Sequence, residues 1–180
     1  MRKELFQTID IPEGVEVNIN DNEIIVKGNE GELKREFSFG KLNVDKKDNQ
    51  LVIGFKQSTK KEKKSMNTII AHIKNMINGV QNKFEYKLKI CSGHFPMTVK
   101  VDGKTALVKN FLGGKIDKKV DLLNDVDVDI KGQDIILKSK DKELAGQVAA
   151  NFEKSTRITN KDRRIFQDGI FIVNKAGREI

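Results

Sequence analysis

"VNINDNEIIVKGNEGELKREF" (residues 17–37) and "VKVDGKTALVKNFLGGKIDKKV" (99–120) follow one pattern at two places in the chain. A shift of 82, which becomes 83 after one inserted residue, aligns apolar residues and glycines: Val17 with Val99, Val26 with Val108, Gly31 with Gly114, Leu33 with Ile116 and Phe37 with Val120. Self-similarity at a nearly constant shift is typical of a repeated supersecondary unit. The sequence therefore predicts two copies of one small domain.

The segments that follow the repeat also correspond. Apolar residues recur at helical spacing, and a shift of 79 aligns Met66 with Ala145, Ile69 with Val148, Ile70 with Ala149 and Ile73 with Phe152. An apolar stripe of this period predicts an amphipathic helix. Thr59 and Glu62 fit a capping box at the start of the first helix, and Gly79 fits its end. Ser139 or Asp141 is expected to cap the second helix.

Short apolar or alternating runs predict strands in both copies. They lie at 15–19, 24–26, 34–39 and 51–55, and then at 97–101, 106–108, 116–122, 126–130 and 135–137. The predicted fold class is α+β, with two tandem homologous domains that each pack a small antiparallel β-sheet against one α-helix, and with a C-terminal strand-containing extension. The predicted domains are 1–81 and 82–180.

The composition limits the functional classes. No run of about 18 apolar residues occurs, so no membrane-spanning segment or membrane partner is expected. The single cysteine, Cys91, excludes an internal disulfide and favours a cytoplasmic location. The net charge is +8, and segments 56–64 and 154–180 each have a net charge of +4. Concentrated positive charge favours a nucleic-acid partner.

The stretch "RRIFQDGIFIVNK" (163–175) has no counterpart in the first copy. Asp168 and Gly169 are expected to form a tight turn, and the apolar run 170–173 a strand that anchors the segment. Arginines before this anchor would be held in place to bind phosphate. The alternative is a structural strand with solvated arginines. The anchoring turn is assigned to Asp168, Gly169, Ile170 and Phe171.

Two other motifs allow more than one interpretation. "NFLGGK" (110–115) combines an amide, an aromatic ring, two glycines and a lysine, and is either a phosphate-contacting loop or an ordinary turn. "CSGH" (91–94) offers a thiol and an imidazole, but neighbouring side chains in an extended segment rarely reach each other as a nucleophile and base. Two histidines and one cysteine are too few for a zinc site. We expect neither a catalytic centre, nor a metal or other cofactor, nor a small-molecule substrate.

Several stretches together resemble the archaeal and eukaryotic form of the large-ribosomal-subunit protein six family, whose eukaryotic member is called protein nine. They are "VKGNEGELKREF" (26–37), "HFP" (94–96), "NFLGGK" (110–115) and "NKDRRIFQDGIF" (160–171). Lys154 stands where the family usually has glutamine. The resemblance implies a structural constituent of the large ribosomal subunit, ribosome-bound in the cytoplasm. It implies contacts with large-subunit rRNA and neighbouring ribosomal proteins, near the stalk base and the sarcin–ricin loop where translational GTPases dock.

From charge and resemblance together, rRNA-binding residues are predicted in the second copy: Lys109, Asn110, Lys115, Arg157, Lys161, Arg163, Arg164, Phe166, Lys175 and Arg178. Phe166 is expected to pack under the turn or to stack on a base. Three alternatives stay open on the residues alone. They are an RNA-binding assembly factor that the mature ribosome does not retain, a small enzyme built on Cys91 and His94, and a protein-binding scaffold that uses strand edges.

Overall fold

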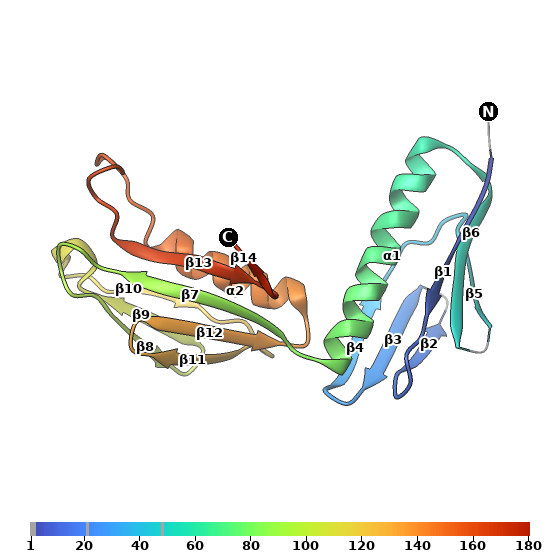
Figure 1. Cartoon of the computed structure of the whole chain (residues 1–180), viewed down its shortest axis with the longest axis horizontal. Coiled ribbons are helices and arrows are strands. Elements are labelled where there is room, and N and C mark those ends of the chain that lie inside the picture. Colours follow the sequence, from blue (N-terminus) through green and yellow to red (C-terminus); the bar gives the residue numbers. More distant parts are fainter. Residues whose placement is uncertain (1–2, 21, 48) are drawn as a thin grey trace. The chain divides into compact units, whose positions relative to one another are not determined.

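The computed structural model describes residues 3–20, 22–47 and 49–180. Its contacts divide the chain into two compact units, Met1–Lys83 and Phe84–Ile180, which are called the N-terminal and the C-terminal unit below (Figure 1). Each unit has one long helix and antiparallel sheets, which confirms the α+β class and the duplicated arrangement. Among the described residues, no helix is long and apolar enough to cross a membrane.

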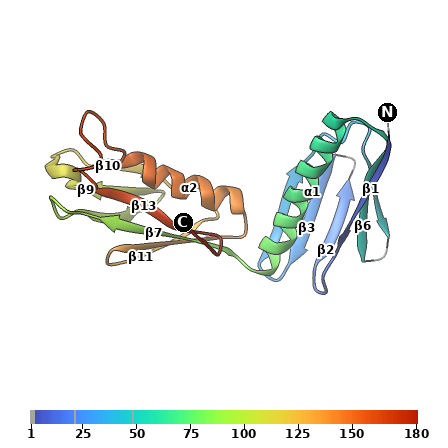
Figure 2. The same ribbon diagram turned by 45° about the horizontal axis from the view of Figure 1, so that its top comes forward.

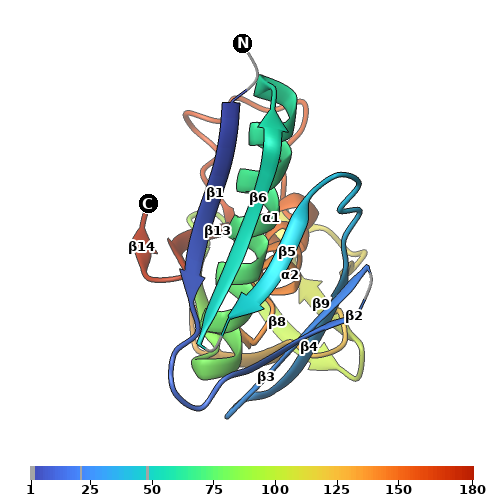
Figure 3. The ribbon, with the colours of Figure 1, turned by 90° about the vertical axis from the view of Figure 1, so that its right-hand side faces the viewer.

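The described residues of the N-terminal unit form two three-stranded antiparallel sheets and one helix. One sheet has the order β1-β6-β5 and the other β2-β3-β4 (Figure 3). The elements are β1 (Lys3–Asp10), β2 (Glu16–Asn20), β3 (Glu23–Gly28), β4 (Gly31–Glu36), β5 (Asn43–Lys47), β6 (Gln50–Ser58) and α1 (Lys60–Gln81). Strands β1 and β5 were not predicted. Strand β4 ends at Glu36, whereas the sequence predicted a strand that continues to residue 39.

Helix α1 begins as expected and ends later than expected. The Glu62 carboxylate accepts a hydrogen bond from the Thr59 backbone N–H at 2.6 Å, as a capping box requires. The predicted end at Gly79 is wrong. Val80 is fully buried, and its carbonyl accepts a hydrogen bond from Glu30 N–H at 2.9 Å. Burial of the next apolar residue therefore carries the helix past a glycine that in isolation favours termination.

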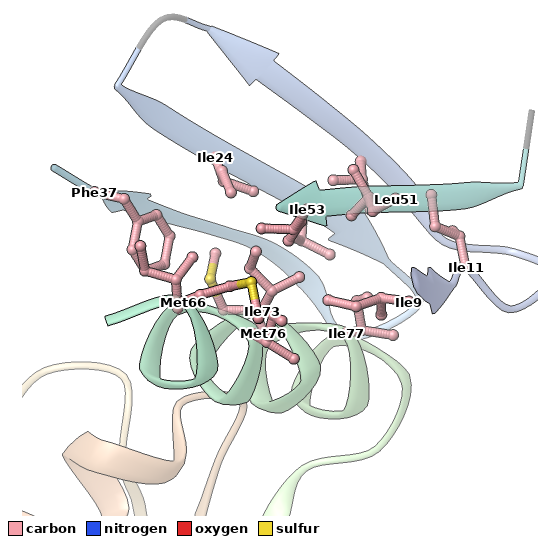
Figure 4. Packing of buried hydrophobic residues seen from close by; sticks show 14 of the residues in the cluster. Ile9, Ile11, Ile24, Phe37, Leu51, Ile53, Met66, Ile73, Met76 and Ile77 are labelled. Carbon is pink, nitrogen blue, oxygen red and sulfur yellow. The ribbon is translucent and has the colours of Figure 1, made fainter. Parts of the chain in front are cut away.

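The apolar stripe of α1 forms the core of the N-terminal unit with the inner faces of the strands. Met66 and Ile73 are fully buried, and Ile77 is nearly so. They pack against Ile24 and Ile53 in the cluster shown in Figure 4. The helical period of the sequence therefore corresponds to the buried face of α1.

The C-terminal unit repeats this arrangement and adds strands to it. A three-stranded sheet has the order β10-β9-β8, and a five-stranded sheet the order β11-β12-β7-β13-β14. The elements are β7 (Phe84–Cys91), β8 (Thr98–Asp102), β9 (Thr105–Lys109), a 3-10 turn (Phe111–Gly113), β10 (Lys118–Asp121), β11 (Asp127–Lys131), β12 (Asp134–Ser139), α2 (Lys142–Ser155), β13 (Gly169–Lys175) and β14 (Arg178–Glu179). The central strand β7 was not predicted. Helix α2 packs on this unit's sheets (Figure 2).

Both predicted caps contribute to the start of α2. Asp141 is the N-cap residue, and its side chain accepts a hydrogen bond from Glu143 N–H at 2.8 Å. Ser139 Oγ accepts a hydrogen bond from Asp141 N–H at 3.1 Å and donates one to the Asp125 carbonyl oxygen at 2.7 Å. The buried serine thus ties the turn before the helix to the loop before β11.

The strand register supports the repeat and corrects one part of its alignment. Val17 pairs with Val26, and their equivalents Val99 and Val108 pair in the same way. In the third strand, however, Val26 pairs with Leu33 whereas Val108 pairs with Lys118. Leu33 therefore corresponds to Lys118 and not to Ile116, which is 83% exposed. The reason is the 3-10 turn, which replaces the two-residue hairpin loop of the first copy.

In the part of the N-terminal unit that the structure describes, no strand corresponds to β13. It pairs along β7, from Gly169 opposite Cys91 to Lys175 opposite Tyr86. The predicted strand at residues 170–173 is confirmed, and β14 extends the sheet by one short strand. By topology β7 corresponds to β1, which within the described residues pairs only with β6. The tail therefore covers a sheet edge that the first copy leaves open.

Candidate nucleic-acid interface

Residues 156–168, called the tail loop below, connect α2 to β13 and are closed at their base by a hydrogen bond. The buried Thr156 Oγ1 accepts it from Ile170 N–H at 2.9 Å. Ile170 is itself fully buried in the core. A Cβ added to Gly169 would lie 3.4 Å from Thr156 Oγ1 and 3.2 Å from the Phe171 ring, so a glycine suits this junction. The two ends of the loop are therefore held together.

Asp168 fixes the tail loop to the segment that follows β7. One carboxylate oxygen accepts hydrogen bonds from Gly93 N–H at 2.6 Å and His94 N–H at 2.9 Å, and the other is bonded to His94 Nδ1. Burial of Asp168, which is 3% exposed, opposes its ionisation, but the bonds from His94 and Gly93 outweigh burial and lower its pKa. The carboxylate is therefore a structural link rather than a free charge.

This anchor differs from the tight Asp-Gly turn that was expected. Gly169 is already the first residue of β13, with φ of 156°, and pairs with Cys91. Asp168 works instead by accepting backbone hydrogen bonds from a segment far away in the sequence. No turn motif within the tail could have shown this partner.

Phe166 belongs to a stack and is not a free platform. Its ring lies on the His94 imidazole with centroids 4.8 Å apart and planes tilted by 22°. The Lys161 ammonium lies 4.6 Å from the Phe166 centroid, within cation–π range. Of the two roles expected for Phe166, the structure favours packing. Lys161 is positioned by this ring.

The two neighbouring arginines of the tail loop differ in their surroundings. Arg164 is paired with Asp162, with Nη2 at 2.7 Å from Oδ2 and Nε at 3.1 Å from Oδ1, although its side chain is 90% exposed. This pairing raises the pKa of Arg164 and lowers that of Asp162. Within residues 3–20, 22–47 and 49–180, no ion-pair partner is found for Arg163 or Arg157. These two exposed guanidinium groups are therefore available to an external anion.

A cleft of 930 Å³ opens between the tail loop, the end of α2 and the segment after β7. Its cations are Lys154, Arg157 and Arg163, and Glu153 is the exposed carboxylate on its wall. Its apolar surface comes from Ile158, Ile165, Phe166 and Phe171. The cleft thus combines positive charge with apolar and aromatic walls.

The loop containing Lys109, Asn110 and Lys115 adjoins the same segment after β7. Asn110 has φ of 58°, and its Nδ2 donates a hydrogen bond to the Pro96 carbonyl at 2.9 Å. A Cβ on Gly113 would lie 3.3 Å from the Phe95 ring. Residues 93–96 therefore contact the tail loop on one side and this loop on the other. Lys109 is ion-paired with Asp117 at 3.6 Å, and Lys115 is exposed.

Two of the expected RNA-binding residues lie elsewhere. Lys175 is at the far end of β13 from Gly169, about 20 Å away at the usual rise per strand residue. Arg178 pairs with Lys175 across the β13–β14 hairpin. The structure therefore does not bring this pair together with the cations of the cleft.

The Cys91–His94 pair does not form the arrangement of a nucleophile and its base. The imidazole Nδ1 is bonded to Asp168, and the ring faces Phe166. Across the described residues, Cys91 makes no side-chain hydrogen bond, and no group of three metal-ligating side chains occurs. Sequence reasoning considered His94 as a possible base for Cys91 and missed its role as the tail's partner.

The positive segment of the N-terminal unit lies at the start of α1. Lys60, Lys63 and Lys64 are exposed and border a shallow groove with Asn67 and Thr68. A helix N-terminus disfavours cations, so these lysines do not serve helix stability. Unlike the cleft, the groove is lined by no isoleucine or phenylalanine side chain.

Comparison with known proteins identifies close relatives over almost the whole chain. A sequence model of the family described as ribosomal protein L6 matches residues 11–83 and 95–169. The protein named large ribosomal subunit protein uL6 from Methanosarcina mazei is 41% identical over 98% of this chain and 100% of its own length. Its namesakes from Sulfurisphaera tokodaii and Methanobrevibacter smithii are also 41% identical, over 95% and 94% of this chain and 92% and 95% of their own lengths.

Proposed function

Because the chain belongs to the ribosomal protein L6 family, we propose that it is a structural constituent of the large ribosomal subunit. In this role it binds large-subunit rRNA and neighbouring ribosomal proteins, and it is ribosome-bound in the cytoplasm. The observation that carries the proposal is the similarity over nearly the full length of relatives named for that subunit. The protein needs no cofactor for this role.

The finer part of the proposal concerns where the RNA is bound. We assign the main contact to the C-terminal unit, near the stalk base and the sarcin–ricin loop. The unpaired Arg157 and Arg163 on a tail loop held at both ends support this assignment. A fixed cation loses less conformational freedom on binding phosphate than a mobile one. Phosphate contacts of this kind position a protein on RNA.

The other predicted contacts remain part of the proposal with different roles. Lys109, Asn110 and Lys115 lie on the loop that adjoins residues 93–96, so they extend the surface of the cleft. Lys175 and Arg178 would contact a separate phosphate. Lys161 and Phe166 support the tail loop, and Arg164 contributes less to phosphate binding because Asp162 already offsets its charge.

The test uses the full-length protein and an rRNA fragment that carries the sarcin–ricin loop, with an unrelated RNA duplex as the control. Affinities are measured across a salt series. We expect a clear preference for the rRNA fragment and a steep fall in affinity with salt, since each neutralised phosphate adds to the slope. Equal affinity for the two RNAs would contradict the placement.

A second measurement separates a ribosomal constituent from an assembly factor. Large subunits are purified from cells that make a tagged chain, and are washed at high salt. We expect the chain to stay on mature subunits. Its presence on precursor particles alone would favour the assembly factor.

A further inference from the structure

The cleft beside the tail loop has the size and chemistry of a site for a small ligand. Its volume of 930 Å³ lies at the upper end of the range of about 300–1,000 Å³ that is usual for such sites. Ile165 and Phe171 line it and are 65% and 40% exposed, so apolar surface is open to whatever enters. Large apolar side chains exposed together in a cleft commonly mark a binding surface.

The charges of the cleft favour an anion that also has an apolar part. Lys154, Arg157 and Arg163 contribute three positive charges, against the exposed Glu153. The other carboxylate on the wall, Asp168, is 3% exposed and already accepts three hydrogen bonds. The net positive wall excludes an apolar peptide segment as the favoured occupant and suits a phosphate.

The two phenylalanines of the cleft are not equivalent. One face of the Phe166 ring is stacked on the His94 imidazole. Phe171 makes no ring–ring or cation–π contact within the described ranges, and its side chain is held near Gly169 at the start of β13. An aromatic ring that is exposed and fixed on a strand is the usual platform for an unstacked base.

We propose that the cleft binds one unpaired nucleotide of the RNA, with its base on Phe171 and its phosphate on Arg157 and Arg163. The proposal rests on the proposed function, because it specifies what the RNA inserts at that site. It assigns to Phe171 the stacking role that the sequence suggested for Phe166. It also means that the C-terminal unit recognises a bulge, loop or flipped base rather than a continuous duplex.

The test uses the full-length protein and two probes. One is single-stranded hexaadenylate with a central 2-aminopurine, whose fluorescence is quenched when it stacks, and the other is a blunt RNA duplex. We expect quenching on binding to the wild type. Phe171→Leu should weaken hexaadenylate binding about five- to a hundredfold and remove the quenching, as expected for loss of one base stack, with little change in duplex binding.

Phe6→Leu is the matched control, because Phe6 is a strand residue of similar exposure, 42%, that lies outside the cleft. A second pair of variants does not depend on the folding of Phe171→Leu. Ile165→Asp places a negative charge in the cleft, whereas Ile180→Asp places it on a residue of similar exposure that does not line the cleft. Each variant adds one negative charge, so both should weaken hexaadenylate binding slightly. We expect Ile165→Asp to weaken it more than Ile180→Asp does.

Three results would overturn the inference. They are unchanged hexaadenylate affinity and quenching in Phe171→Leu, equal effects of the two aspartate variants, or no hexaadenylate binding where the sarcin–ricin rRNA fragment saturates the protein. In each case a preference for the rRNA fragment would show that the proposed function survives through backbone contacts alone. Loss of that preference in the wild type would instead reject the proposed function.

Discussion

Asp168 and His94, which are 74 residues apart in the sequence, are joined by a backbone and a side-chain hydrogen bond. The pair links the start of β13 to the segment after β7. It therefore determines where the tail loop and its cations lie relative to the sheet.

Replacing this carboxylate should lower stability. In Asp168→Asn, one of the two acceptor oxygens becomes an NH₂ group that faces a hydrogen-bond donor. We expect the free energy of unfolding to fall by about 1.5–3 kcal/mol, the usual contribution of a hydrogen bond to a charged group. Urea denaturation measures this. Asp162→Asn is the control, because that exposed carboxylate pairs with Arg164 within the loop and its loss should cost clearly less than that of Asp168.

The same group predicts how stability depends on pH. The pKa of Asp168 is lower in the folded protein than its ordinary value of 3.8, so the unfolded chain takes up the proton first as the pH falls. The stabilising contribution is present above pH 3.8 and is lost as the pH falls through the folded-state pKa. The difference in unfolding free energy between wild type and Asp168→Asn should therefore shrink as the pH falls below 3.8. A difference that grows in acid would contradict the assignment.

Arg163 and Arg164 should contribute unequally to RNA binding. Arg163→Gln removes an unpaired cation, so it should weaken affinity and lower the salt slope by about one. Arg164→Gln should have a smaller effect, because Asp162 already offsets the charge of Arg164. Fluorescence anisotropy with the rRNA fragment across a salt series compares them. Equal losses would show that the Arg164–Asp162 pair does not persist in solution.

The hairpin of the N-terminal unit should not tolerate a side chain at Gly28. A Cβ there would lie 2.8 Å from Val80 Cγ2 and 2.9 Å from the Val80 carbonyl oxygen. We expect Gly28→Ala to destabilise the protein by about 1–3 kcal/mol, as overpacking usually does. Thermal unfolding checks this, with Gly93→Ala as the control, because its added methyl would lie 3.9 Å from the nearest atom. Adding Val80→Ala should restore little, since the carbonyl remains.

The proposed domains 1–81 and 82–180 should fold separately. Each has its own core, one around Ile73 and the other around Phe152. Phe152→Ala should cost about 3–5 kcal/mol in the C-terminal unit and leave the N-terminal unit folded. Amide hydrogen exchange, measured on the full chain, reports the stability of each unit separately. Loss of protection throughout both units in this variant would show that they unfold together.

The repeat was readable from the sequence because the features it repeats are local. The pairs Val17–Val26 and Val99–Val108 face each other across two hairpins, so one shift relates them. The alignment of the third strand was wrong by two residues, and a shift of two preserves which face each side chain occupies. This is why the fold class survived an error that aligned the exposed Ile116 with the partly buried Leu33.

The features of the fold and of the site that the sequence did not predict depend on contacts between distant parts of the chain. Strand β7 was missed although Tyr86, Leu88 and Ile90 alternate with polar residues, and its position at the centre of a five-stranded sheet follows only from its pairing with β12 and β13. The link between Asp168 and His94 has no local signature. The positive charge of the tail loop was visible in the sequence. Whether Arg163 or Arg164 is free depends on the geometry of Asp162.

The open edge of β1 has a consequence for solubility. An unpaired strand edge presents backbone donors and acceptors to any passing strand and so favours aggregation. In the C-terminal unit, β13 removes this risk along β7. In the N-terminal unit, the edge is protected by other means, because the pairing of β1 with β6 is irregular between Lys3 and Leu5, and Glu4 places an exposed charge there. The two copies thus differ in what their corresponding edges present to a passing strand, because one is covered by β13 and the other carries an irregularity and a charge.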